Sequence, residues 1–185
     1  MKLDAKSLGL PGCFSTRLPT FEDDRGSFQK LFHAGGFDAY LPGFLPREVY
    51  LSSSARGVLR GMHFQLPPDD HAKVVVCLGG KVTDVLLDLR PGKTYGRTVT
   101  VELLPEGQNA VLIPKGIAHG FYAQSNDSAL LYLVETVHSP DNDMGVLWSS
   151  FGYTWDSGTP ILSARDTKHP PFAEFCPPDD WLSTT

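Results

Sequence analysis

The densest group of side chains able to do chemistry lies in residues 57–65, where a guanidinium, Arg60, precedes an imidazole, His63. An imidazole can take up a proton near neutral pH, and a nearby cation can stabilise an anion that forms in a reaction. Two glycines, Gly57 and Gly61, weaken a strand and indicate a bulge or a ligand close to the backbone. Strict alternation would place Arg60 and His63 on opposite faces. Both can therefore line one pocket only if the strand is irregular there.

The chain also contains, within and outside residues 57–65, the residue types needed to remove a proton from a carbon next to a carbonyl. This reaction needs a base held by a carboxylate and a cation facing the developing enolate, and inversion also needs an acid on the opposite face. The chain offers His63 as the base, Asp166 as the carboxylate, Lys73 as the cation and Tyr132 as the acid. Spacing alone does not bring the four together, and each taken singly suits an ordinary core or surface position.

A second segment, residues 113–121, contains Pro-x-Gly-x-x-His, the second half-motif of the cupin jelly roll. In metal-binding cupins this histidine, here His119, is often a ligand together with an earlier His-x-His pair. Gln65 stands where the second imidazole of that pair would be, and His71 has no partner at ligand spacing. A catalytic metal needs about three protein ligands, so we expect no metal site. His119 is then either a metal ligand or a hydrogen-bonded histidine beside a cavity.

The elements that must position these side chains are short strands separated by turns. Residues 98–103 alternate between apolar and polar side chains, and residues 81–89 are rich in β-formers. Further strand candidates are residues 57–64, 72–78, 109–114 and 129–138. Helix signals are poor, apart from a short turn at residues 37–40. The pattern predicts an all-β antiparallel sandwich or jelly roll with short peripheral helices. We expect a single domain, 1–185, with its core at about 45–140 and an irregular C-terminal wrap at about 148–185.

Composition excludes several partner classes. The formal net charge is -5, which leaves no electrostatic footprint for nucleic acid. No apolar stretch approaches the length of a membrane span, and the first residues lack the apolar core of a signal peptide. Cys13, Cys77 and Cys176 have no CxxC spacing, as is usual for free thiols. We therefore expect a soluble, cytoplasmic protein.

Several strings, in the same order, resemble the dTDP-4-dehydrorhamnose 3,5-epimerase family, whose fold is the cupin jelly roll. The resemblance runs from about Asp24 to Asp166 and is carried by D-R-G-S-F at 24–28, G-V-L-R-G-M-H-F-Q at 57–65, K-V-V at 73–75, V-T-D-V-L-L-D-L-R at 82–90, I-P-K-G-I-A-H-G-F at 113–121 and L-S-A-R-D at 162–166. It implies an enzyme that inverts C3, C5 or both carbons of a nucleotide-linked 4-keto-6-deoxyhexose. It also implies a homodimer that uses no metal and no organic cofactor.

The resemblance assigns roles to individual residues. His63 is the base, Asp166 orients it and stabilises its protonated form, Lys73 stabilises the enolate, and Tyr132 protonates the other face. Arg25 and Arg60 bind the diphosphate. The remaining expected substrate contacts are Phe28, Glu48, Tyr50, Gln65 and His119.

The chain departs from the family pattern at recognition positions. Glu48 and Tyr50 replace the usual Q-x-N, Val137 and His138 replace tyrosines, and Met144 replaces an arginine. These changes indicate a specialised relative, which inverts a single carbon or takes a nucleotide other than dTDP. The alternative hypothesis is a metal-dependent or non-catalytic cupin that binds a small carbohydrate.

Overall fold

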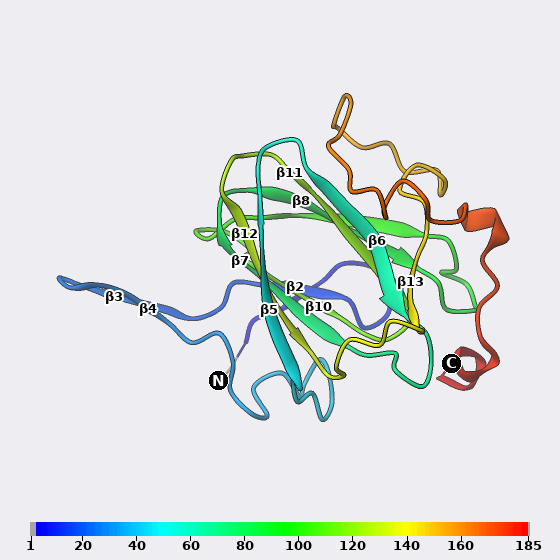
Figure 1. The fold of residues 1–185 in the computed structure, drawn as a ribbon. Helices are drawn as coiled ribbons and strands as arrows, with labels where there is room; N and C mark the ends of the chain where they lie inside the picture. The colour runs from blue at the N-terminus through cyan, green and yellow to red at the C-terminus, as the bar shows by residue number, and fades with distance from the viewer. Residues whose placement is uncertain (1–2, 185) are drawn as a thin grey trace.

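Two facing antiparallel sheets make up most of the computed structural model, which describes residues 3–184 (Figure 1). The first sheet has six strands in the order β1-β2-β10-β7-β12-β5. Their bounds are β1 Lys6–Ser7, β2 Phe14–Thr16, β5 Glu48–Ser54, β7 Lys73–Gly79, β10 Ala110–Ile113 and β12 Ser128–Val134. The second sheet has five strands in the order β13-β6-β11-β8-β9. Their bounds are β6 Leu59–Gln65, β8 Val82–Asp88, β9 Thr98–Leu103, β11 Ile117–Ala123 and β13 Asp143–Gly145. The prediction of an all-β sandwich is confirmed.

Three apolar clusters hold the layers together. One lies between the two sheets, where Val75 and Cys77 of β7 meet Leu86 and Phe121 of the other sheet. A second lies on the outer face of the six-stranded sheet, which the turn around Phe37 covers, and a third lies between the five-stranded sheet and the C-terminal segment. Because β7 is covered on both faces, its apolar run is continuous and does not alternate.

Several predicted boundaries are corrected. The strand expected at 129–138 ends at Val134, after which the backbone leaves the sheet for the pocket rim. The strand expected at 57–64 begins at Leu59, because Gly57 has a φ of 89° and lies in a turn. β5 was not predicted, since this edge strand is mostly exposed. Within residues 3–184 the helices are two short 3-10 turns near the C-terminus, η1 at Phe172–Glu174 and η2 at Asp179–Thr184.

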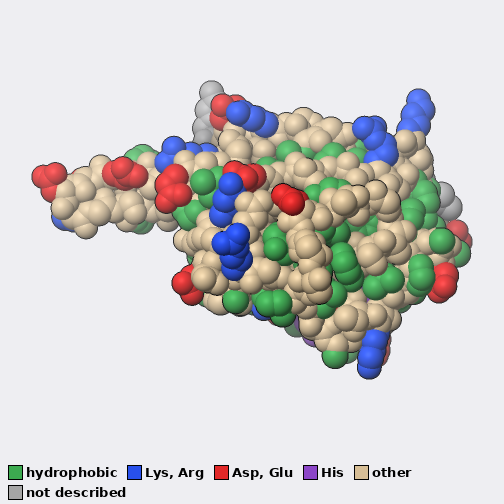
Figure 2. Space-filling model, turned by 90° about the horizontal axis from the view of Figure 1, so that it is seen from above, with side chains coloured by type: hydrophobic (Ala, Val, Ile, Leu, Met, Phe, Trp, Pro, Cys, Tyr) green, Lys and Arg blue, Asp and Glu red, His purple; other side chains and the backbone are tan. Residues whose placement is uncertain are grey.

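A separate two-stranded hairpin, β3 (Thr20–Asp23) and β4 (Gly26–Gln29), extends away from the sandwich (Figure 1). The view from above shows it projecting clear of the body, with acidic side chains toward its tip (Figure 2). Its aromatic residues Phe21 and Phe28 are 63% and 61% exposed. Large apolar side chains with this much exposure are typical of a surface that contacts another protein.

The C-terminal segment after β13 crosses the outer face of the five-stranded sheet. Ile161 exchanges backbone hydrogen bonds with Gly57 and Leu59 (2.8 and 3.0 Å), and Pro170 accepts one from Leu147 (2.9 Å). These bonds fix the chain on both sides of Asp166. Across the described part of the chain, no helix is long and apolar enough to cross a membrane.

Candidate active site

A cavity of about 440 Å³ opens between the two sheets, and it contains most of the predicted site residues. Those on its wall are Glu48, Tyr50, Arg60, His63, Gln65, Lys73, His119 and Tyr132. They come from β5, β6, β7, β11 and β12, so both sheets contribute. Polar side chains gathered in a concave site of this size suit a small polar ligand.

His63, which lines this cavity, contacts the carboxylate of Asp166 behind the wall, with 2.6 Å between Nε2 and Oδ1. The His63 side chain is 32% exposed, whereas that of Asp166 is 4% exposed. Burial acts to raise the pKa of Asp166, but the hydrogen bond and charge of His63 and a hydrogen bond from Ser163 outweigh it and hold this pKa below its ordinary value. Because Asp166 engages Nε2, the other ring nitrogen, Nδ1, is left to meet a ligand. The pair is therefore a base with an orienting carboxylate.

An irregularity in β6 explains how Arg60 and His63 reach the same cavity. On β11, His119 pairs with His63 and Phe121 pairs with Arg60, so two residues lie between the β6 partners and only one between those of β11. This extra residue reverses the alternation. Gly61 makes it possible, because its φ is 126° and a β-carbon there would lie 2.5 Å from the Cα of Gly120. The bulge indicated by the glycines is confirmed.

A second histidine–carboxylate pair includes His119, which lines the same cavity. His119 Nε2 lies 2.7 Å from Asp84 Oδ2, and both residues are buried. The interpretation of His119 as a hydrogen-bonded histidine agrees with this contact. The other carboxylate oxygen, Oδ1 of Asp84, is buried without a hydrogen-bond partner among the described residues.

Lys73 places a cation on the cavity wall, with only 7% of its surface exposed. Burial lowers its pKa from the ordinary 10.5 to about 8, although the negative charges of Asp143 and Asp84 act in the opposite direction. The amine is therefore still charged at neutral pH, and it can stabilise a negative charge that develops on a ligand.

Tyr132 faces the cavity from β12 and stacks on Tyr50, its register partner on β5, with ring centroids 4.7 Å apart. Its ring also contacts that of His119 at 6.0 Å. Burial, together with the negative charge that Tyr50 carries when ionised, raises the pKa of the Tyr132 hydroxyl well above its ordinary value. The hydroxyl therefore keeps its proton at neutral pH and can donate it.

The rim of the cavity is built from hydrogen-bonded polar residues. Arg60 donates to the side chain of Ser54 (3.1 Å) and to the carbonyl of Ser53 (3.2 Å). Glu48 accepts a hydrogen bond from the His138 backbone (2.7 Å), which ties the start of β5 to the segment after β12. Arg60 is the one predicted diphosphate ligand on this wall.

The side chains of Gln65 and His71 are hydrogen-bonded to other residues of the protein. The Gln65 amide donates to the Asp69 carbonyl (2.7 Å) and to Thr136 (3.2 Å), and its carbonyl accepts from the Ser139 backbone (2.9 Å). His71 Nδ1 lies 2.6 Å from Thr136, and burial lowers the His71 pKa to about 3. These contacts indicate that both residues fix the loops at the rim.

Three predicted site residues are not on the cavity wall: Asp166, which reaches the site through its contact with His63, and two residues of the hairpin. Arg25 and Phe28 are on the projecting hairpin, and the Arg25 side chain is 89% exposed and paired with Asp23. Neither residue lines the cavity of its own chain. The sequence pattern groups them with the site, but the fold of one chain does not.

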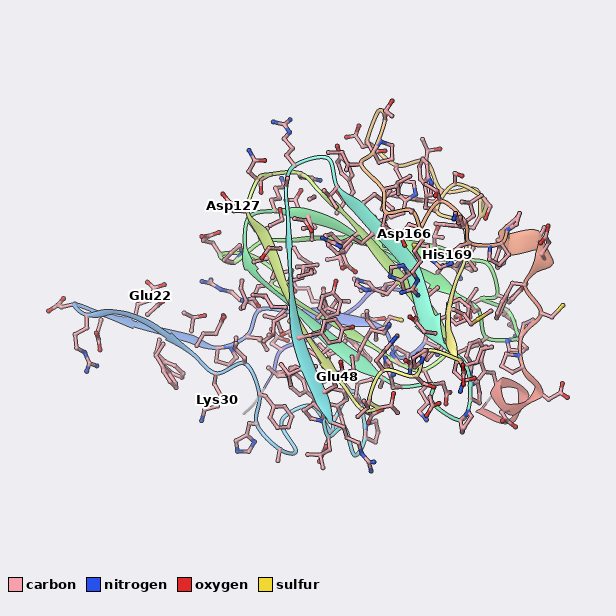
Figure 3. All side chains as sticks on the ribbon, in the orientation of Figure 1. Glu22, Lys30, Glu48, Asp127, Asp166 and His169 are labelled. Atoms are coloured by element: carbon pink, nitrogen blue, oxygen red, sulfur yellow. The ribbon has the colours of Figure 1, made fainter. Side chains whose placement is uncertain are left out.

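Asp84, Arg165 and His169 belong to the site or contact it, and sequence reasoning did not assign them. Arg165 is on the cavity wall and donates to Asp143 (2.7 Å). His169 follows Asp166 by three residues, and the two side chains lie next to each other beside β6 (Figure 3). Burial and the positive charges of His63 and Arg165 lower the pKa of His169. The short spacing to Asp166 was the available signal for His169.

Comparisons with known proteins agree with this geometry. A family model described as dTDP-4-dehydrorhamnose 3,5-epimerase matches residues 7–174. The dTDP-4-dehydrorhamnose 3,5-epimerase of Streptomyces griseus is 35% identical over 176 residues, which cover 92% of this chain and 87% of the relative. The dTDP-4-dehydrorhamnose 3-epimerase of Streptomyces niveus is 37% identical over 165 residues, covering 87% of this chain and 80% of the relative. The crystal structure of NovW, a 4-keto-6-deoxy sugar epimerase from the novobiocin cluster of Streptomyces spheroides, gives a TM-score of 0.87 at 35% identity, covering 94% of this chain and 89% of NovW.

Proposed function

Because the chain belongs to the dTDP-4-dehydrorhamnose 3,5-epimerase family, and its sandwich is the cupin jelly roll of that family, we propose how its cavity carries out the family's reaction. The protein is an epimerase of nucleotide-linked 4-keto-6-deoxy sugars in deoxysugar biosynthesis. The observation that supports a particular base is the 2.6 Å contact between Asp166 and His63, which lines the cavity.

His63 removes the proton from the carbon next to the ketone. Nδ1 accepts this proton, because Nε2 is engaged by Asp166, and the carboxylate stabilises the imidazolium that forms. The electron pair of the broken C–H bond moves onto the ketone oxygen, which becomes an enolate. The buried Lys73 ammonium on the cavity wall stabilises this oxygen.

Inversion then requires a proton from the opposite face of the sugar. Tyr132 supplies it, since its hydroxyl is kept protonated and its ring lies in the six-stranded sheet across the cavity from β6. Delivery to the carbon collapses the enolate to the ketone with the new configuration. No step needs a change of oxidation state, and we propose that the reaction uses neither a metal nor an organic cofactor.

Substrate recognition combines the cavity rim with a second copy of the chain. Arg60, Glu48 and Tyr50 lie where a nucleotide diphosphate would enter. Arg25 and Phe28 reach such a ligand only if the hairpin of one chain extends to the cavity of another. We therefore propose a cytoplasmic homodimer in which each hairpin completes the partner's site. The exposed rings of Phe21 and Phe28 support this arrangement.

Solvent isotope exchange tests the proposed chemistry. In D₂O, the wild-type protein should introduce deuterium next to the ketone of a dTDP-, CDP- or GDP-linked 4-keto-6-deoxyhexose. His63→Ala should reduce the exchange rate by ~10²–10⁴-fold, the usual contribution of general base catalysis. Asp166→Asn should also slow it, because an amide cannot stabilise the imidazolium.

His33→Ala is a matched control, since His33 lies outside the cavity wall. The variants should be checked for unchanged melting before rates are compared. Near wild-type exchange in His63→Ala would remove His63 from the mechanism.

A further inference from the structure

His63, Asp166 and His169 form a cluster that the epimerase mechanism only partly uses. Within residues 3–184 these three are the one group whose histidine and carboxylate ligand atoms all lie within 4.8 Å of one another. Asp166 Oδ1 is at its centre, 2.6 Å from His63 Nε2 and 3.5 Å from His169 Nε2. The two imidazoles meet edge to face, with ring centroids 5.4 Å apart.

His169 is the member of this cluster whose Nε2 lacks a hydrogen bond among the described residues. Its side chain is 10% exposed, and its Nε2 is buried and makes no hydrogen bond within the described structure. At 3.5 Å this Nε2 lies close to Asp166 Oδ1 but makes no hydrogen bond to it. A buried imidazole nitrogen in this state has an unused binding capacity.

The strand β13 has no side chain in the space that His169 occupies. Gly145 is the register partner of His63 on β13, and a β-carbon at Gly145 would overlap the His169 ring. The ring therefore fills the place of a missing side chain next to the base. This packing holds its Nε2 toward Asp166.

Two imidazoles and one carboxylate are a ligand set that suits Zn²⁺ and related ions. With ligand bonds of about 2.1 Å, two ligands of one tetrahedral ion lie about 3.4 Å apart. The His169–Asp166 distance already matches this spacing. The His63–Asp166 distance must widen from 2.6 Å, which amounts to less than about 1 Å. The fourth position of the ion is left for water.

We propose that a Zn²⁺ ion binds to His63, Asp166 and His169 and switches the epimerase off. The switch rests on the proposed role of His63 as the base. In the active form the ring proton is on Nε2, directed at Asp166, and Nδ1 holds the lone pair. When Zn²⁺ takes a lone pair on Nε2, the same proton moves to Nδ1. Nδ1 is then a donor and cannot accept a proton from the sugar, although no proton or electron has been gained or lost.

The first experiment measures binding without using activity. Co²⁺ is titrated into metal-free wild-type protein, its visible absorption bands are followed, and Zn²⁺ is added to displace it. One ion per chain should bind, and His169→Ala should bind at least ~10-fold more weakly, since loss of an outer partner of a metal ligand alone costs 10–100-fold. His169→Gln is a second variant that keeps a polar side chain of similar size. His138→Ala is the control, because this exposed histidine lies at the same cavity rim.

The second experiment measures isotope exchange with increasing Zn²⁺, each variant relative to its own metal-free rate. Zn²⁺ should inhibit wild-type and His138→Ala protein at the same concentration, and His169→Ala should require at least ~10-fold more. Failure of wild-type protein to bind Co²⁺, or equal inhibition of His169→Ala and wild type, overturns the proposal. Binding without inhibition overturns the switch. Absence of exchange in every metal-free protein overturns the proposed function, whereas the Co²⁺ spectra still decide the metal site.

Discussion

Replacing Lys73 by methionine separates what this side chain does for catalysis from what its burial costs the fold. The folded protein holds the Lys73 pKa at about 8, against an ordinary 10.5. Each pH unit between the two values corresponds to about 1.4 kcal/mol, so the charged amine destabilises the folded state by about 3 kcal/mol. Methionine has a similar length, carries no charge and suits the buried position.

The sign of the pH dependence follows from proton binding. Below about pH 8, both folded and unfolded chains carry the charged lysine, and the full cost is present. Between about pH 8 and 10.5 the unfolded chain binds more protons than the folded chain, so wild-type stability rises with pH relative to Lys73→Met. The variant should be more stable by about 3 kcal/mol near neutral pH, which corresponds to a melting temperature higher by roughly 6–12 °C for a chain of this length. By about pH 10 this advantage should have shrunk by about 2–3 kcal/mol.

Chemical denaturation of both proteins across this pH range, at one protein concentration, measures the difference. Isotope exchange should meanwhile fall by ~10²–10³-fold in Lys73→Met, because the enolate loses its cation. Lys93→Met is the control, since Lys93 is exposed and should show no pH-dependent difference in stability. A stability difference between Lys73→Met and wild type that does not change with pH would refute the reasoning.

Two further predictions follow from the proposed dimer and from the changed recognition residues. Arg25→Ala should raise KM. Mixing unfolded Arg25→Ala and His63→Ala chains before refolding should restore activity, because the mixed dimer contains one site with both residues intact. No recovery on mixing would show that the hairpin does not serve a partner. With Val137 and His138 in place of the family's tyrosines, one of C3 and C5 should exchange deuterium long before the other in NMR spectra, since positioning errors of about 1 Å can cost ~10²-fold in rate. Equal incorporation at both carbons from the earliest time points would contradict this.

Local patterns predicted the strands well where one face is buried. Residues 98–103 alternate between apolar side chains that face the core and polar side chains, and β9 has these same bounds. The edge strand β5 carries exposed Val49 and Leu51, so its apolar pattern does not identify a core-facing side. Its place in the sheet is set by pairing with β12, a contact that the local sequence does not contain.

The candidate site could be assembled from the sequence only as far as motif resemblance extends. The His63–Asp166 contact spans 103 positions, and its distance depends on how the C-terminal segment crosses β6. Arg60 and His63 share a cavity because of a bulge that the two glycines indicated but could not place. His169 was missed because its proximity to His63 depends on the absence of a side chain at Gly145. The prediction of a single domain stays a prediction.

The ribosome adds Asp166 only after the strands of both sheets have been made. The thirteen strands of the described part of the chain are complete by Gly145, and the carboxylate that orients the base is made about twenty residues later. A growing chain can thus assemble both sheets while His63 still lacks its partner. The epimerase gains its base only when the segment after β13 docks through Ile161, next to the start of β6, and through Pro170, next to Leu147, so a stretch translated after both sheets turns a folded sandwich into an enzyme.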